Sequence, residues 1–253
     1  MSDRPFVTVL KTLPLALSGV VLGMMLAAAD YHVDWKAACF LLLAVSCLHI
    51  LANVKNIQEY EPDSYKVLSW ILLILAIACG LTTVYLSFGS LFLLESFILM
   101  IFGYFAVNSA LRRTIGVNPL SSRRLTPVYS FVFLGPLSVL GTYYICAHTF
   151  SSWLILLPAA SVGLFSMLAT DAGRKPLFML LLIVGGWTAA VVYSCLRMFD
   201  IWHFCFVLTL PLFIWYLITA TKRNTPDQPL ALLYVSIFAF TVLTGLGYLV
   251  FLF

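Results

Sequence analysis

The chain contains nine apolar runs, each about the 20 residues that an α-helix needs to cross the hydrocarbon core of a bilayer. None of the runs alternates apolar with polar residues, and each is too long for a strand of a membrane barrel. We therefore predict an all-α, polytopic membrane bundle of about nine transmembrane helices. The predicted spans cover residues 12–29, 35–53, 67–87, 90–109, 127–147, 151–170, 176–196, 201–220 and 230–252.

Composition supports a lipid-facing surface. Hydrophobic residues make up 62% of the chain and charged residues only 9%, whereas soluble domains carry about 25% charged residues. The sequence shows no linker, low-complexity segment or repeat, so residues 1–253 are predicted to form a single domain. The basic residues are dispersed among the loops, which argues against a nucleic acid as partner.

The distribution of basic residues predicts the orientation of the bundle. With the N-terminus in the cytoplasm, twelve of the 14 lysines and arginines fall on the cytoplasmic side, as the positive-inside rule requires. Only Lys36 and Arg197 fall on the other side. The twelve are Arg4, Lys11, Lys55, Lys66, Arg112, Arg113, Arg123, Arg124, Arg174, Lys175, Lys222 and Arg223.

The first long cytoplasmic loop carries a candidate metal site. Asn56, Glu59 and Asp63 are spaced by three and four residues, which places them on one face if the second helix extends beyond the membrane. Oxygen ligands in such a set suit Mg²⁺, which takes one or two carboxylates and shares its remaining positions with substrate phosphates. The alternative is a solvated acidic loop.

Two further cytoplasmic loops carry candidate phosphate ligands. Arginine and lysine at the membrane boundary bind a diphosphate through charge-assisted hydrogen bonds, although topology and anionic lipid binding explain the same residues. Asp171 adds a carboxylate to the third loop, and Asn53 and Asn108 lie near cytoplasmic helix ends, where they are expected to line the site. The predicted diphosphate ligands are Arg123, Arg124, Arg174 and Lys175.

Several stretches resemble the UbiA superfamily of prenyltransferases, and most closely its 1,4-dihydroxy-2-naphthoate polyprenyltransferase branch. Residues 51–63 resemble the first aspartate-rich motif, N-D-x-x-D-x-x-x-D, and residues 118–125 with 129–144 resemble the branch's PL-Y-GLGD-VF-FFG-V-GTYY region. Residues 171–177 resemble the end of the second motif, D-x-x-A-G-K-R-T-L. Residues 210–212 and 225–230 resemble the family's C-terminal end, and the order of all these stretches matches the family.

The aspartate motifs are degenerate. Lys55, Asn56, Glu59 and Asp63 stand at the first motif's N, D, D and D positions. In an alternative register, Asn56 is the motif Asn and an isoleucine falls at an Asp position. The second motif lacks its D-x-x-x-D pair, and Met167 stands four residues before Asp171.

The resemblance implies a UbiA-like membrane prenyltransferase that moves a polyprenyl group from its diphosphate to a small aromatic acceptor, as in menaquinone or ubiquinone biosynthesis. It implies Mg²⁺ as cofactor, held by Asn56, Glu59, Asp63 and Asp171, and a multi-pass location in the bacterial inner membrane with the active face in the cytoplasm. The alternative is a catalytically impaired family member that binds isoprenoid or quinone lipids, and a third hypothesis is an unrelated transporter or scaffold.

Overall fold

The computed structural model describes residues 5–58, 65–112, 126–170, 176–197, 200–222 and 227–250. Every regular element in these residues is helical. The first five elements are α1 (Pro5–Asp30), α2 (Trp35–Gln58), α3 (Lys66–Phe88), α4 (Leu94–Arg112) and α5 (Thr126–Val132). They are followed by the π-helical turn η2 (Phe133–Leu137), α6 (Ser138–Ala147), the 3-10 turn η3 (Trp153–Ile155) and α7 (Leu156–Thr170). The last four are α8 (Pro176–Arg197), the 3-10 segment η4 (Ile201–Thr209), α9 (Leu210–Lys222) and α10 (Asp227–Leu249).

The helices form a polytopic membrane bundle, which confirms the predicted fold class. Within the described residues, seven helical segments are long and apolar enough to cross a bilayer, and Leu94–Phe105 and Trp153–Ala169 are shorter apolar helices. Three of the nine predicted spans are composite: α5, η2 and α6 follow one another without a break, as do η3 with α7 and η4 with α9. Most predicted boundaries agree with the structure to within about four residues, a normal error for helix ends. The exceptions are α1, which begins seven residues before the predicted span, and α2, which ends five residues after it.

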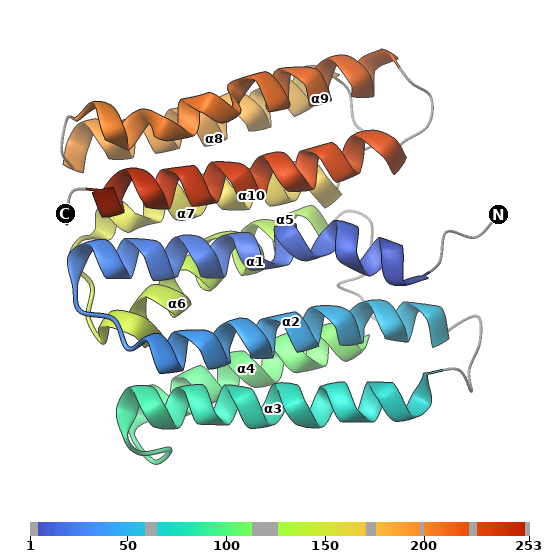
Figure 1. Cartoon of the computed structure of the whole chain (residues 1–253), viewed down its shortest axis with the longest axis vertical. Coiled ribbons are helices and arrows are strands. Elements are labelled where there is room, and N and C mark those ends of the chain that lie inside the picture. The colour runs from blue at the N-terminus through green and yellow to red at the C-terminus, as the bar shows by residue number, and fades with distance from the viewer. Residues whose placement is uncertain are drawn as a thin grey trace.

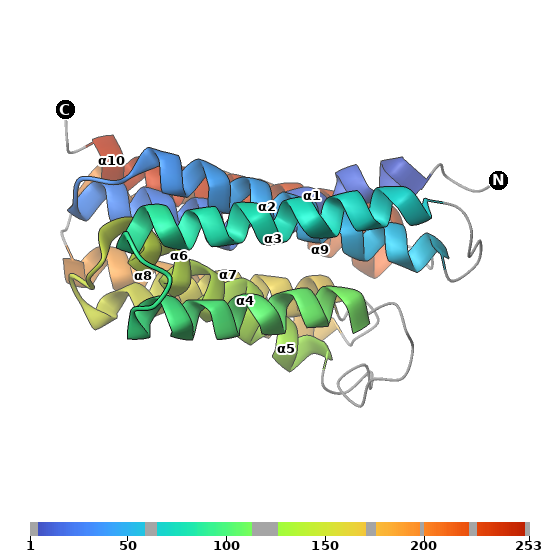
Figure 2. The same ribbon diagram turned by 90° about the horizontal axis from the view of Figure 1, so that it is seen from below.

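The bundle has two layers of antiparallel helices. Figure 1 shows α3, α2, α1, α10 and α9 in one row, and Figure 2 shows α4 to α8 in a second layer beside it. We call the end of the bundle where α1 begins at Pro5 the near end, and the end where α1 finishes at Asp30 the far end. Because successive spans alternate in direction, every loop that was predicted to be cytoplasmic joins helices at the near end.

Small residues bring α1 close to the neighbouring span. A Cβ atom added at Gly19 would lie 2.5 Å from the carbonyl oxygen of Leu134, and one added at Gly23 would lie 2.5 Å from that of Val139. The two glycines are four residues apart and therefore share one face of α1. This is the small-residue packing that membrane helices use, since lipid supplies no hydrophobic force between them.

A second close approach joins η2 to α7. A Cβ atom added at Gly135 would lie 2.4 Å from the Cα atom of Gly163. Pro136, the next residue, has no amide hydrogen to donate and lies inside the π-helical turn, the kind of local irregularity that proline commonly accompanies. The segment that most resembles the prenyltransferase family therefore sits between α1 and α7, near the centre of the bundle.

The outward side chains are apolar. Trp70 on α3, Leu94 on α4 and Leu208 on η4 are large hydrophobic residues exposed on the surface of the chain. Soluble monomers rarely expose so many large apolar side chains, whereas a protein surface that faces lipid is expected to do so. The inward side chains include an aromatic cluster in which Phe165, Phe206, Phe213 and Phe240 are fully buried.

Candidate functional site

The topology brings together, at the near end, the helix ends that flank the loops with the predicted site residues. The three loops that carry them connect α2 to α3, α4 to α5 and α7 to α8, and all six helix ends that they join lie at the near end (Figures 1 and 2). The loop residues themselves lie outside the described part of the chain. These are Glu59, Asp63, Arg123, Arg124, Asp171, Arg174 and Lys175.

Helix α2 extends further than its apolar run. It continues to Gln58, five residues beyond the predicted end of the span. The shared face predicted for Asn56, Glu59 and Asp63 required such an extension, and the described helix provides it as far as Asn56. Asn53 and Asn56 are three residues apart within this extension and lie on the same side of the helix. The side chains of Asn56 and of Asn108, in the last turns of α4, lie outside the described part of the structure.

A hydrogen-bonded group of three side chains joins α1 to α2 at the near end. Thr12 Oγ1 lies 2.8 Å from Nε2 of His49. The amide nitrogen of Asn53 lies 3.2 Å from the same Nε2 and donates to the His49 carbonyl oxygen at 2.9 Å. An amide nitrogen can only donate, so Nε2 is the acceptor of the Asn53 contact. Asn53, predicted to line the site, is therefore held in place by its neighbours.

This group consists of a hydroxyl, an imidazole and an amide. It fixes the relative position of α1 and α2 one turn before the predicted metal ligands of the first loop. Within the residues that the structure describes, there is no group of three or more His, Cys, Asp or Glu side chains suited to a metal ion. The side chains of the four predicted Mg²⁺ ligands lie outside the described part of the structure, so the magnesium site stays a prediction.

The far end contains a polar network that the sequence analysis did not find. Asp30, the last residue of α1, forms an ion pair with Arg197, the last residue of α8. The other carboxylate oxygen of Asp30 accepts hydrogen bonds from Tyr143 Oη at 2.5 Å and from Ser151 Oγ at 2.7 Å. The side chain of Asp30 is only 7% exposed and that of Arg197 is 21% exposed, so both charges are largely removed from solvent.

The guanidinium of Arg197 makes further contacts. It donates to the hydroxyl of Tyr193, and its central carbon lies 5.6 Å and 5.5 Å from the ring centroids of Tyr193 and Tyr248. These are cation–π distances. The hydroxyls of Tyr248 and Ser194 are 2.9 Å apart. The network therefore ties together α1, α6, α8 and α10, at the end of the bundle opposite the predicted site.

The sequence did contain a signal for this pair. Arg197 is one of only two basic residues that fall on the side opposite the cytoplasmic loops. A cation that breaks the positive-inside pattern at a helix end needs a local partner, because a partly buried charge is costly unless it is paired. Asp30 ends a helix on the same side, and pairing the two would have been a sound inference.

Comparison with known proteins gives the chain two bacterial relatives. No family model matches it. The chain is 25% identical over 252 residues to a 1,4-dihydroxy-2-naphthoate octaprenyltransferase of Escherichia coli, in an alignment that covers 81% of the chain and 80% of that protein. It is 30% identical over 180 residues to a protein of the same name from Haemophilus influenzae, covering 62% of the chain and 58% of the relative. These similarities support the resemblance to the UbiA-type prenyltransferases that the loop motifs indicated.

Proposed function

We propose that the chain is a membrane prenyltransferase that moves a polyprenyl group from its diphosphate to a small aromatic acceptor in quinone biosynthesis. The observation that carries this proposal is that the helix ends flanking the three loops with carboxylate and basic residues all lie at the near end of one membrane bundle. The names of the two bacterial relatives support the same reaction class. By the distribution of basic residues, the near end faces the cytoplasm.

The basic residues of the loops would bind the diphosphate. Arg123 and Arg124 offer planar guanidinium groups that form paired hydrogen bonds with phosphate oxygens, and Arg174 with Lys175 adds positive charge from the α7–α8 loop. We propose Asn56, Glu59, Asp63 and Asp171 as the residues that hold Mg²⁺ there. A bound Mg²⁺ supplies charge stabilisation for the departing diphosphate.

The reaction itself exchanges one bond for another. The bond between the first prenyl carbon and the diphosphate oxygen breaks, and its electron pair leaves with the diphosphate. The resulting allylic cation is attacked by a carbon of the aromatic acceptor, which forms the new carbon–carbon bond. The acceptor regains its aromaticity by losing the group that the prenyl chain replaces, a proton in the simplest case. The apolar walls of the bundle would keep water from the cation.

The second candidate function is isoprenoid or quinone binding without turnover. Met167 supports it, because it stands at the position of a carboxylate in the family's second motif. In the structure Met167 lies in the last turns of α7 and packs against the buried cluster around Phe165. A thioether in that environment is a poor ligand for Mg²⁺, which prefers oxygen. The first and third loops would then have to hold the ion with fewer carboxylates.

A reconstituted assay tests the proposal. Purified protein in detergent or liposomes is mixed with radiolabelled polyprenyl diphosphate, 1,4-dihydroxy-2-naphthoate and Mg²⁺, and the prenylated product is measured. We expect product formation that EDTA abolishes, and a loss of at least about 100-fold in rate for Asp63→Asn, since a metal ligand and its charge are removed together.

The matched control is Asp200→Asn. Asp200 is an acidic residue at the far end, where its side chain caps η4 by accepting from the Trp202 amide. This variant should retain the wild-type rate. Tight binding of polyprenyl diphosphate with no product, in protein that is otherwise folded, would reject prenyl transfer in favour of lipid binding. Equal rates for Asp63→Asn and Asp200→Asn would refute the predicted site.

A further inference from the structure

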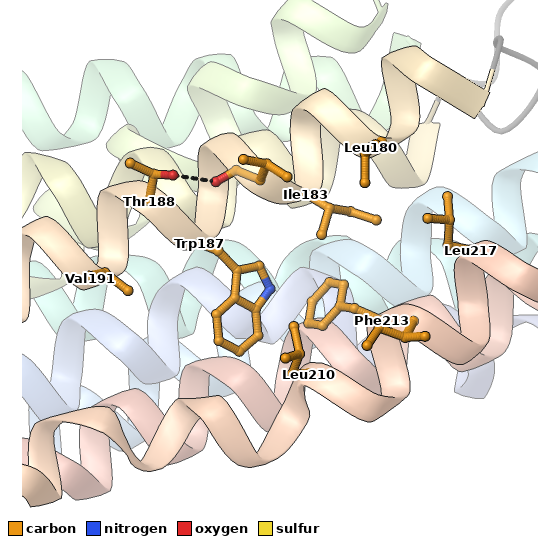
Figure 3. Close-up of a pocket in the computed structure, with 10 residues that line it drawn as sticks. Leu180, Ile183, Trp187, Thr188, Val191, Leu210, Phe213 and Leu217 are labelled. Atoms are coloured by element: carbon orange, nitrogen blue, oxygen red, sulfur yellow. Dashed lines mark hydrogen bonds between the residues drawn. The ribbon is translucent and has the colours of Figure 1, made fainter.

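An apolar groove runs between α8 and α9 on the outer side of the bundle. It has a volume of about 380 Å³, within the range of small-molecule sites. Side chains from Leu180 to Val191 on α8 and from Leu210 to Leu217 on α9 line it (Figure 3). Helix α8 packs much more closely on α7 than on α9, and this light packing leaves the space. Leu180, Val184 and Ile214 are exposed, so the groove opens towards lipid.

The groove contains one polar feature that its own walls leave unsatisfied. Nε1 of Trp187 is buried and has no hydrogen-bond partner among the described residues. Its ring lies edge-on to Phe213, with centroids 6.0 Å apart, and the nitrogen is on the side that faces Phe213 (Figure 3). The hydroxyl of Thr188, also in the wall, donates to the Val184 carbonyl oxygen at 2.8 Å. The indole N–H is therefore a donor in the groove wall that a ligand reaches only when a neighbouring side chain moves.

The depth of Trp187 restricts what can accept this hydrogen bond. Trp187 lies eleven residues after Pro176 and ten before Arg197 in α8, which at 1.5 Å per residue puts it about 15 Å from either end of the helix. That is the middle of a hydrocarbon core of about 30 Å. The ester oxygens and head groups of phospholipids lie outside this core. An acceptor at the level of Trp187 must belong to a neutral lipid that enters the bilayer centre.

We propose that this groove binds one prenylated aromatic lipid, whose ring oxygen accepts a hydrogen bond from Trp187 Nε1 and whose branched tail lies along α8 and α9. The assignment of this lipid class rests on the proposed function, because a ring with an isoprenoid tail is the kind of product that prenyl transfer to an aromatic acceptor releases. Nε1 is covered by its neighbours, so the ring of Phe213 rotates when the oxygen binds.

The lining of the groove disfavours the donor substrate at the same place. The groove-lining residues include no charged side chain, and a diphosphate at mid-membrane depth without a cation would carry a prohibitive desolvation cost. The site is thus distinct from the diphosphate site proposed at the near end. Its chemistry fits a neutral molecule that leaves the near end after the diphosphate has been lost.

The test is equilibrium binding to the purified full chain in detergent micelles. The probe is a tritiated 1,4-naphthoquinone with a geranylgeranyl tail, and its comparison is the same tail ending in a methyl group. Trp187→Phe removes the N–H and keeps an aromatic ring beside Phe206, Phe213 and Phe240. Its matched control is Trp215→Phe, the same change on the exposed face of α9, outside the groove. Val184→Trp fills the groove, and Leu181→Trp, its control, places the same ring on the neighbouring exposed position of α8.

We expect Trp187→Phe to weaken binding of the quinone by roughly 2- to 10-fold, the effect of one net hydrogen bond, while Trp215→Phe and Leu181→Trp bind as the wild type does. Val184→Trp should abolish binding without lowering the unfolding temperature by more than Leu181→Trp does. Equal affinity of wild type and Trp187→Phe, or equal affinity for the quinone and the ringless tail, would overturn the proposal. Because the assay needs no turnover, a failure of prenyl transfer leaves this result unaffected and is detected separately.

Discussion

The buried ion pair at the far end gives the sharpest stability prediction. Asp30→Leu leaves Arg197 with the Tyr193 hydroxyl and two ring faces as its remaining partners, and it also removes the acceptor used by Tyr143 and Ser151. Removing one partner of a buried pair typically costs about 3–5 kcal/mol. Since Arg197 keeps some exposure and cation–π contacts, we expect about 3 kcal/mol for this variant.

Arg197→Met should cost less. Asp30 then still accepts hydrogen bonds from Tyr143 and Ser151, and methionine fills much of the space that the arginine stem occupied. We expect about 2 kcal/mol. The double variant Asp30→Leu/Arg197→Met leaves neither charge unpaired, so its cost should be about 2 kcal/mol and well below the sum of the single changes, as expected for two groups in direct contact.

The assay is unfolding of the purified protein in detergent, followed by near-UV circular dichroism or by the reactivity of buried cysteines such as Cys146. For a chain of this size, each kcal/mol corresponds to about 2–4 °C in Tm, so Asp30→Leu should unfold roughly 10 °C below the wild type. Lys36→Met, which removes an exposed basic residue at the same end, is the control and should change Tm by less than about 2 °C. Additive single and double changes would refute the ion pair as a stabilising contact.

Three further predictions follow from the packing and from the orientation. Gly135→Ala places a methyl group 2.4 Å from Gly163 Cα and should lower the free energy of unfolding by about 1–3 kcal/mol. Gly141→Ala, with open space at its Cβ, should be neutral or stabilising by about 0.5 kcal/mol. Thermal unfolding of the two variants tests this difference. Asn53→Leu removes a donor to the His49 carbonyl and ring and should destabilise the fold by about 1 kcal/mol. Asn53→Asp replaces the amide donor by an acceptor and should destabilise it more, because Nε2 of His49 would then face a second acceptor. Equal destabilisation by the two variants would argue that Nε2 carries the proton. In a cysteine-free background, Lys11→Cys should react with an impermeant maleimide only after the membrane is permeabilised, whereas Lys36→Cys should react in intact cells. The reverse pattern would overturn the predicted orientation.

The membrane fold could be read from the sequence because its cause is local. Each span is an uninterrupted apolar run, and backbone groups in hydrocarbon must be satisfied within the segment, which leaves the helix as the solution for such runs. The irregular segments within spans were not predicted. The π-helical turn at Phe133–Leu137 depends on Pro136 and on the close approach of Gly135 to α7, and a contact with another helix is not written in the local pattern of apolar residues.

The polar residues of the near end were easier to predict from the sequence than the polar network of the far end. The motifs placed the candidate ligands in three loops, and the topology joins those loops to one end of the bundle. The hydrogen bonds of His49 to Thr12 and Asn53 were not foreseen, because they depend on how α1 packs against α2. The Asp30–Arg197 pair joins residues 167 positions apart in the sequence. Periodicity and motif spacing report only on near neighbours, so the signal for this pair was the departure of Arg197 from the positive-inside pattern.

The two ends of the bundle differ in how they are held together. At the far end, charged and aromatic groups of α1, α6, α8 and α10 satisfy one another, so their positions are fixed by contacts that are costly to break. At the near end, hydrogen bonds among Thr12, His49 and Asn53 link α1 to α2, each worth about 1 kcal/mol. In the proposed reaction the substrate binds at the near end, while the contacts at the far end keep the helices in register. Removing the Asp30–Arg197 pair should therefore lower the free energy of unfolding whether or not substrate is present. It should lower the rate of prenyl transfer only to the extent that the bundle unfolds.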